Sequence, residues 1–442
     1  MDRNSIFGIV IIIAIVFIFS YLQKPSDEQV RRDQQILDSL ERVEKARKVQ
    51  AQSAVVALAD TAVKVTVSID ELQDKLGSFA VAGTGSKQFY TLENNLMKVV
   101  FTNKGGIVYS VELKKYKNHR KETVKLFNGD STIFALNFFT AQNRSISTND
   151  LYFVPMDSGS SHIEVKASDS IRYFTLRLNA GRDQYIDYIY GLAPDSYKLN
   201  FRINMKGMDK VMAANANAVD LKWEMYIPQQ EKGRDNEDTY TSINYKYFQD
   251  NVEEMPGATK DFKDYKIDNR LKWIAYKQQF FSSVLIAGDY FDNGLVKTHK
   301  LTGDTNHLRL FTAETSIGIK KSEYVSIPLA FYYGPNHYTT LKGYGDDLEE
   351  LVKLGKNVVK WVNRFLIIPV FNFLNRFISN YGIIILILTI LIKLLLLPLT
   401  YSSYLSQAKM KVLKPQIDEI NEKIPAEKAM ERQQATMALY KK

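Results

Sequence analysis

Three hydrophobic patterns follow one another along this chain. Residues 6–22 form a continuous apolar run, residues from Phe89 onward alternate between apolar and polar, and residues 381–399 form a second continuous run. A run of about 20 apolar residues matches the thickness of a bilayer core, whereas alternation with a period of two is typical of half-buried β-strands. The pattern therefore predicts a large sheet domain between two membrane helices.

The first apolar run has two interpretations. It is near the short end for a membrane span, so a cleaved signal peptide is one possibility. However, the run is longer than the apolar part of a usual signal peptide, and no small-x-small cleavage site follows Phe19. We favour a retained membrane helix over residues 1–23.

A polar segment follows the first helix. Ile36, Leu37, Leu40 and Val43 form a thin apolar stripe that ends before it fills the heptads needed for a coiled coil. Residues 24–87 are therefore expected to be a solvated helical tether that closes in a Gly- and Ser-rich linker.

The alternating region predicts many short strands. Residues 97–102 and 107–113 flank Gly105-Gly106 and indicate a hairpin. A polar insert at residues 229–268 interrupts the pattern, and turn residues separate the other segments. The expected strands are residues 133–139, 148–154, 162–167, 172–179, 185–191, 197–204, 219–227, 273–286 and 327–333. Strands at this spacing predict an antiparallel β-sandwich over residues 88–345, so the fold class is a membrane protein with α plus β structure.

Residues 346–380 have a mixed character. Residues 358–378 are very apolar, yet charged and amide side chains interrupt them. We expect an amphipathic helix in the plane of the membrane, kinked near Pro369. The alternative, a spanning helix over residues 365–377, is too short.

The second apolar run, residues 381–399, predicts a membrane helix that contains one cation, Lys393. Its ammonium could extend to the headgroups near Pro398, or it could face a watery cavity in a helix bundle and attract a polar or acidic segment. The residues alone leave these two interpretations open.

Charge predicts the topology. The chain turns basic after Pro398, and the positive-inside rule places that segment in the cytoplasm. Two spans then place the N-terminus in the cytoplasm and residues 24–380 outside. Charges around the first span weakly favour the opposite orientation, but the asymmetry at the second span is larger.

Composition narrows the function. The net charge of +9 over 442 residues comes without an arginine-rich block, which favours anionic lipid over specific nucleic acid as a partner. The absence of cysteine excludes disulfides, zinc–thiolate sites and cysteine nucleophiles. The five histidines are scattered, and nucleotide-binding or hydrolase motifs are missing, so we expect no metal, no cofactor and no enzyme. Glycosidase carboxylates have little local signature, so a carbohydrate-active sandwich stays open.

A set of short motifs carries a resemblance that covers nearly the whole chain. These motifs are Leu397-Pro398-Leu399-Thr400, Ala408-Lys409-Met410, Leu413-Lys414-Pro415-Gln416-Ile417 and Met437-Ala438-Leu439-Tyr440-Lys441, and upstream Glu93-Asn94-Asn95-Leu96, residues 273–281 and Tyr333-Gly334-Pro335. In this order and spacing they resemble the YidC-type membrane protein insertases of the Oxa/Alb family, with a periplasmic domain.

The resemblance implies an insertase and chaperone of the bacterial inner membrane. It implies that nascent membrane proteins are inserted alone or with the Sec translocon, and that the ribosome and membrane lipids are partners. The family has a cation, usually arginine, in a hydrophilic groove where this chain has Lys393. The implied client-binding residues are Lys393, Thr389 and Gln407, and residues 400–442 would be the first arm of a cytoplasmic helical hairpin with Lys409, Lys411, Lys414 and Gln416.

Other functions stay open from the sequence. The family continues with further membrane helices, whereas this chain stops at Lys442, so we expect no insertion by these residues alone. The main alternative is a membrane-anchored protein that binds or modifies carbohydrate. A third possibility is an envelope scaffold in which leucine could replace Lys393.

Overall fold

A computed structural model describes residues 69–129, 132–156, 161–425 and 428–440. The first membrane helix, expected over residues 1–23, and residues 24–68 of the tether lie outside the described residues. The chain separates into two compact units, residues 1–74 and 75–442. The described part begins with helix α3 (Ile69–Leu76) and the 3₁₀ helix η1 (Gly77–Gly83).

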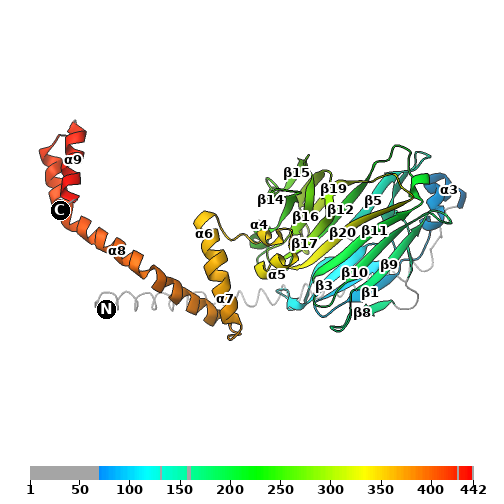
Figure 1. Cartoon of the computed structure of the whole chain (residues 1–442), viewed down its shortest axis with the longest axis horizontal. Coiled ribbons are helices and arrows are strands. Elements are labelled where there is room, and N and C mark those ends of the chain that lie inside the picture. The colour runs from blue at the N-terminus through cyan, green and yellow to red at the C-terminus, as the bar shows by residue number, and fades with distance from the viewer. Residues whose placement is uncertain (1–68, 130–131, 157–160, 426–427, 441–442) are drawn as a thin grey trace, which may run out of the picture. The chain divides into compact units, whose positions relative to one another are not determined.

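Three β-sheets follow, and Figure 1 shows their strands in one body. The five-stranded sheet has the order β4 (Thr123–Asn128), β3 (Val108–Lys117), β2 (Met97–Thr102), β1 (Phe89–Glu93) and β8 (His162–Glu164). Its pairs are antiparallel except β1 with β8.

The other two sheets are antiparallel throughout. The nine-stranded sheet has the order β14 (Val252–Glu254), β13 (Ser242–Tyr247), β16 (Leu271–Lys277), β17 (Phe281–Phe291), β20 (Tyr324–Pro335), β11 (Lys198–Lys206), β10 (Tyr185–Leu192), β9 (Arg172–Asn179) and β7 (Val154–Pro155). The six-stranded sheet has the order β15 (Phe262–Ile267), β18 (Gly294–Lys300), β19 (His307–Gly318), β12 (Ala218–Pro228), β5 (Thr132–Phe139) and β6 (Ser145–Ser147).

Aromatic side chains join the facing sheets. Trp223 of β12 stacks on Tyr276 of β16 with ring centroids 4.0 Å apart, and Phe134 of β5 meets Phe201 of β11 at 5.6 Å. Along β12, buried residues alternate with more exposed ones, as expected for a strand with one face on a core. The large antiparallel β-sandwich predicted from the sequence is therefore confirmed.

Several predicted segments differ in detail. The polar insert at residues 229–268 does not interrupt the strands, because it contains α4 (Arg234–Tyr240), β13, β14 and β15. Among the described strands, β15 pairs only with β18, and its charged residues, at exposed and half-buried positions alike, hide the strand pattern. Residues 273–286 are two strands, β16 and β17, and the start of 148–154 is the 3₁₀ helix η3 (Thr148–Asp150). Strands β18 and β19 were not predicted.

A buried ion pair fastens the region around α4 to the six-stranded sheet. Arg309 of β19 is completely buried and donates to both carboxylate oxygens of Asp238, at 2.6 and 2.9 Å. Its remaining donors reach the carbonyls of Lys260 and Thr259 and the hydroxyl of Thr298. All three guanidinium nitrogens therefore have partners, which is the condition for tolerating a charge in a core.

Short helices lead from the sandwich into an apolar region. They are α5 (Tyr338–Tyr344), the 3₁₀ helix η5 (Leu348–Leu351), α6 (Asn357–Val362), the π-helical turn η6 (Asn363–Ile367) and α7 (Ile368–Asn375). The π turn η6 ends two residues before Pro369, which is the second residue of α7, and the kink predicted near this proline stays a prediction. Lys360 pairs with Glu350 at 2.6 Å, and the side-chain amide of Asn363 donates to the carbonyl of Leu354.

Two further helices complete the described chain: α8 (Tyr381–Lys423) and α9 (Ala429–Tyr440). Residues 400–442 are therefore not a single arm. Arg432 of α9 donates to the side chain and carbonyl of Asn421 near the end of α8, so α9 folds back on that end. The half-buried residues Ile417, Ile420 and Ile424 supply an apolar face at this contact.

Candidate functional site

Helix α8 begins with a side-chain cap and continues beyond the thickness of a membrane. The side chain of Asn380 accepts hydrogen bonds from the backbone N–H groups of Gly382 and Ile383. In the described part of the chain, α8 is the one helix long and apolar enough to cross a bilayer. At 1.5 Å per residue its 43 residues extend roughly 65 Å, about twice a hydrocarbon core. Its C-terminal half therefore has length to project into the aqueous phase.

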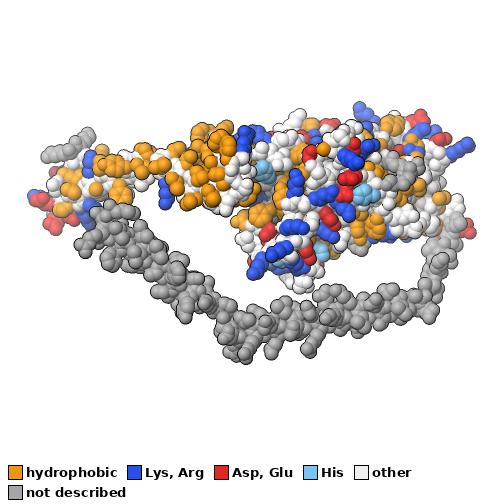
Figure 2. Space-filling model, turned by 90° about the horizontal axis from the view of Figure 1, so that it is seen from below, with side chains coloured by type: hydrophobic (Ala, Val, Ile, Leu, Met, Phe, Trp, Pro, Cys, Tyr) orange, Lys and Arg blue, Asp and Glu red, His pale blue; other side chains and the backbone are white. Residues whose placement is uncertain are grey.

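One side of the start of α8 is occupied by protein. Phe371 of α7 stacks on Tyr381 with ring centroids 5.9 Å apart. Ile384 and Leu388, four residues apart and thus on one face, are buried, while most other residues of α8 are exposed. Figure 2 shows hydrophobic side chains along these C-terminal helices and a mixed surface on the sandwich.

A polar stripe runs along a different side of α8. It consists of Thr389, Lys393, Thr400, Ser403, Gln407, Lys411 and Lys414. The spacings of three, four and seven residues keep all seven on one side at 100° per residue. The sequence prediction had omitted Thr400 and Ser403, although their spacing from Thr389 and Lys393 could have identified them.

The helix separates the predicted site residues into two groups. Thr389, Lys393, Gln407, Lys411 and Lys414 lie on the side of the stripe, whereas Lys409 and Gln416 lie on the opposite side. Thr389 and Gln407 are roughly 27 Å apart along the axis. The residues thus form a track along the helix, because a straight helix cannot gather positions so distant in sequence.

Lys393 has an exposed side chain without a hydrogen bond or ion pair to any described residue. By contrast, the hydroxyls of Thr389 and Thr400 donate to the carbonyls of Ile385 and Leu396, at 2.7 and 2.9 Å. The hydroxyl donors of both threonines therefore have their hydrogen-bond acceptors within the helix itself. Lys393 is therefore the charged group of the apolar segment that is available to an outside partner.

The sandwich has open polar pockets on its surface. One cavity of about 510 Å³ is lined by Glu112, Asn118 and Arg120 among others, and another of about 450 Å³ by Asp220, Lys222 and Glu314 among others. Within the described ranges, His, Cys, Asp and Glu side chains do not form a cluster of three that could hold a metal.

Two acidic pairs of the sequence, Glu253-Glu254 and Asp346-Asp347, contain carboxylates with basic partners. Glu254 pairs with Lys353, Asp346 lies 3.9 Å from the ammonium of Lys272, and Asp347 lies 2.8 Å from that of Lys246. These carboxylates therefore connect residues 346–353 to the nine-stranded sheet.

Fold and helix together define a membrane-anchored protein with a large β-sandwich domain. Residues 90–369 match the family model described as YidC periplasmic domain, and residues 373–442 match the one described as 60Kd inner membrane protein. A membrane protein insertase YidC from Parabacteroides distasonis is 39% identical over 454 residues, covering 100% of this chain and 70% of that protein. One from Porphyromonas gingivalis is 32% identical over 452 residues, with the same coverage.

Solved structures give weaker similarities. A crystal structure of an active YidC insertase with its first transmembrane domain resolved matches at a TM-score of 0.31 and 15% identity, over 77% of this chain and 63% of that chain. A putative aldose 1-epimerase from Escherichia coli matches at a TM-score of 0.34 and 10% identity, over 56% of this chain and 99% of that chain.

The chain belongs to the YidC family of membrane protein insertases. The resemblance noted from the sequence motifs is confirmed, as is the assignment of the sandwich to the periplasmic domain. The relatives are named as insertases and not as enzymes. The protein is accordingly an inner-membrane protein with a periplasmic domain.

Proposed function

We propose that this protein inserts nascent membrane proteins and that the polar stripe of α8 lines the path of the client. The observation that carries the proposal is the unpartnered Lys393, exposed within an apolar helix. A charge in the middle of a bilayer costs free energy unless it meets water or an opposite charge. An acidic flank of a client would supply that charge, and the ammonium would in turn lower the cost of moving the flank into the membrane.

The two sides of α8 suggest how the client leaves. The polar stripe offers hydroxyl, amide and ammonium groups, while the neighbouring faces are leucine and isoleucine. A client segment could keep its polar flank on the stripe while its apolar helix moves sideways into lipid. This movement of the client requires no covalent step and no cofactor, because only the solvation of the client segment changes.

The cytoplasmic parts of the proposal rest on α8 and α9. We propose that the N-terminus and the end of α8 lie in the cytoplasm, that the α8–α9 hairpin receives clients from the ribosome, and that the protein acts as a chaperone alone or with the Sec translocon. The lysines in the C-terminal half of α8, Lys409, Lys411 and Lys414, support the cytoplasmic placement by the positive-inside rule. The amphipathic segment α6–α7 would lie at the periplasmic surface.

Site-specific photocrosslinking tests this proposal. A photoreactive residue at position 393 of the full-length insertase should crosslink to a small membrane protein during its synthesis. Leu395 is the matched control, because it lies about 3 Å further along the axis and roughly 200° around the helix. We expect client crosslinks from position 393 and lipid crosslinks from position 395. Lipid crosslinks alone from both positions would contradict the proposed path.

A further inference from the structure

A small cavity at one end of the sandwich has an unusual lining. It measures about 20 Å³, is partly open to solvent, and is bordered by the end of β11, the 3₁₀ helix η4 (Met208–Lys210) and the connection from β19 to β20. Three of its lining residues are methionines: Met205, Met208 and Met212. A space of this size holds one water molecule or one ion.

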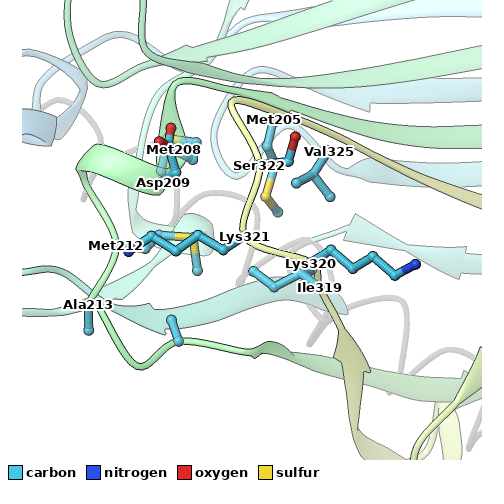
Figure 3. Close-up of a pocket in the computed structure, with 11 residues that line it drawn as sticks. Met205, Met208, Asp209, Met212, Ala213, Ile319, Lys320, Lys321, Ser322 and Val325 are labelled. Carbon is cyan, nitrogen blue, oxygen red and sulfur yellow. The ribbon is translucent and has the colours of Figure 1, made fainter.

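The backbone explains why the three thioethers share this cavity. Met205 is an inward-facing residue of β11 opposite Val325 of β20. Gly207 then takes a positive φ of 65° and donates to the carbonyl of Glu323, which turns the chain into η4. The N–H of Met212 bonds to the carbonyl of Met208 at 2.9 Å, so these two side chains leave the same face of one turn. In Figure 3, Met208 and Met212 approach from the side of η4 and Met205 from the side of the strands.

A carboxylate provides the second observation. Asp209 also lines the cavity, and its Oδ1 is buried without a hydrogen-bond partner among the described residues. A buried acceptor without a donor is costly, and such an atom calls for a bound water or ion. Methionines that only fill a gap would not account for this oxygen.

The donor set selects the kind of ion. Thioethers are soft, uncharged ligands that favour Cu(I) over Zn²⁺, Mg²⁺ or Ca²⁺. One carboxylate oxygen balances one positive charge. We propose that Met205, Met208, Met212 and Asp209 form a binding site for a single soft monovalent cation of the Cu(I) class. Lys320 and Lys321 lie at the rim with exposed side chains, where water and salt screen their charge.

Metal binding by the purified 442-residue chain in detergent tests the site. The probes are Ag(I), which is soft, monovalent and stable in air, and Cu(I) in competition with a coloured chelator. Replacing the exposed methionines Met156, Met410, Met430 and Met437 with leucine first removes competing thioethers from the surface. In this background we expect one tightly bound ion, and X-ray absorption of the Cu(I) form should show sulfur neighbours.

Methionine-to-leucine variants decide the assignment, because they keep the shape of the side chain and remove only the sulfur. Met208→Leu and Met212→Leu should each weaken binding at least about tenfold, in line with the effect of losing metal-site partners. The matched control is Met225→Leu, which is equally buried on β12 but does not line the cavity. Asp209→Asn should weaken binding as well and leave the circular dichroism spectrum unchanged.

Two outcomes overturn the proposal. One is a chain that binds no Ag(I) or Cu(I), in which case the cavity holds only a water molecule. The other is binding that Met208→Leu and Met212→Leu leave as strong as Met225→Leu does. Neither outcome depends on insertion activity, so the insertase function and this site are tested separately.

Discussion

Two cations, Arg309 and Lys393, stand in apolar parts of the same chain and have opposite surroundings. Arg309 is completely buried, and each of its guanidinium nitrogens reaches a carboxylate, a carbonyl or a hydroxyl of the sandwich. Lys393 is exposed on α8 and has no described partner. A cation whose partners belong to its own domain stabilises that domain, whereas a cation without partners in an apolar helix is available for an external one. Three predictions test this contrast, and a fourth tests the hairpin formed by α8 and α9.

The largest expected effect concerns the buried pair. Asp238→Ala leaves Arg309 with only neutral partners, and breaking such a pair costs about 3 to 5 kcal/mol. Thermal and denaturant unfolding of the full chain should show a clear loss of stability. The matched control is Asp268→Ala, whose partner Lys266 is largely exposed, and it should leave the unfolding midpoint unchanged. If Asp238→Ala and Asp268→Ala lowered the stability equally, the buried pair would contribute no more to the fold than an exposed one.

The next effect is on function alone. Lys393→Leu should leave the unfolding midpoint unchanged but lower the insertion of clients with acidic flanks about tenfold. Tenfold corresponds to about 1.4 kcal/mol, or roughly half the cost of an aspartate at the centre of a bilayer. Lys393→Arg should keep most of the activity because it keeps the charge. If Lys393→Leu inserted these clients as well as the parent chain does, Lys393 would only extend to the lipid headgroups and would not contact clients.

A smaller effect concerns Lys277, a second buried cation. It is 6% exposed, and its side chain forms no hydrogen bond or ion pair with a described residue. Burial, reinforced by the nearby charge of Lys353, lowers the pKa of Lys277. The unfolded chain therefore binds more protons between this lowered pKa and the ordinary lysine value of about 10.4, so stability rises with pH across that window.

Lys277→Met should remove this dependence. Relative to the parent chain, the variant should gain on the order of 1 kcal/mol at neutral pH, and the gain should shrink as the pH rises toward 10. Unfolding midpoints of both chains at several pH values below 10 measure the difference. A variant that loses stability at neutral pH would show that Lys277 has a stabilising role.

The smallest effect concerns the end of α8. The chain has no cysteine, so Glu422→Cys with Gln433→Cys provides two unique sites for spin labels beside the Asn421–Arg432 contact. A continuous helical arm would place the two backbones roughly 16 Å apart, whereas the α8–α9 hairpin keeps them close. We expect a short distance whose distribution broadens in Arg432→Ala, since a half-buried hydrogen bond of this kind contributes only about 1 kcal/mol. A single long distance in the parent chain would contradict the hairpin.

Local patterns carried most of the fold prediction. Alternation identified strands such as β9, β11 and β12, because each has one face on the core. It missed β13 and β15. Strand β13 is buried almost throughout and polar in sequence, and β15 is an edge strand with exposed charged residues. Both are strands because neighbours distant in sequence pair with them, which a local pattern does not reveal.

For the candidate site, sequence and structure contributed differently. Lys393 was identified from its charge within an apolar run, and helical spacing would have added Thr400 and Ser403 to the stripe. Only the structure shows that the side chain of Lys393 has no described partner, whereas that of Arg309 has several. The methionine cavity also required them, since the turn at Gly207 and the approach of β20 bring its lining together.

The sequence by itself therefore determined the membrane-spanning segment of α8, the sandwich class and the family, because hydropathy, alternation and short motifs are local properties. Only the tertiary structure decided which charges have partners and where α8 turns back into α9. Those properties depend on contacts between residues far apart in the chain, such as Asp238 with Arg309. Such contacts determine whether a charge has its partners within the fold, as Arg309 does, or has no partner among the described residues, as in the case of Lys393.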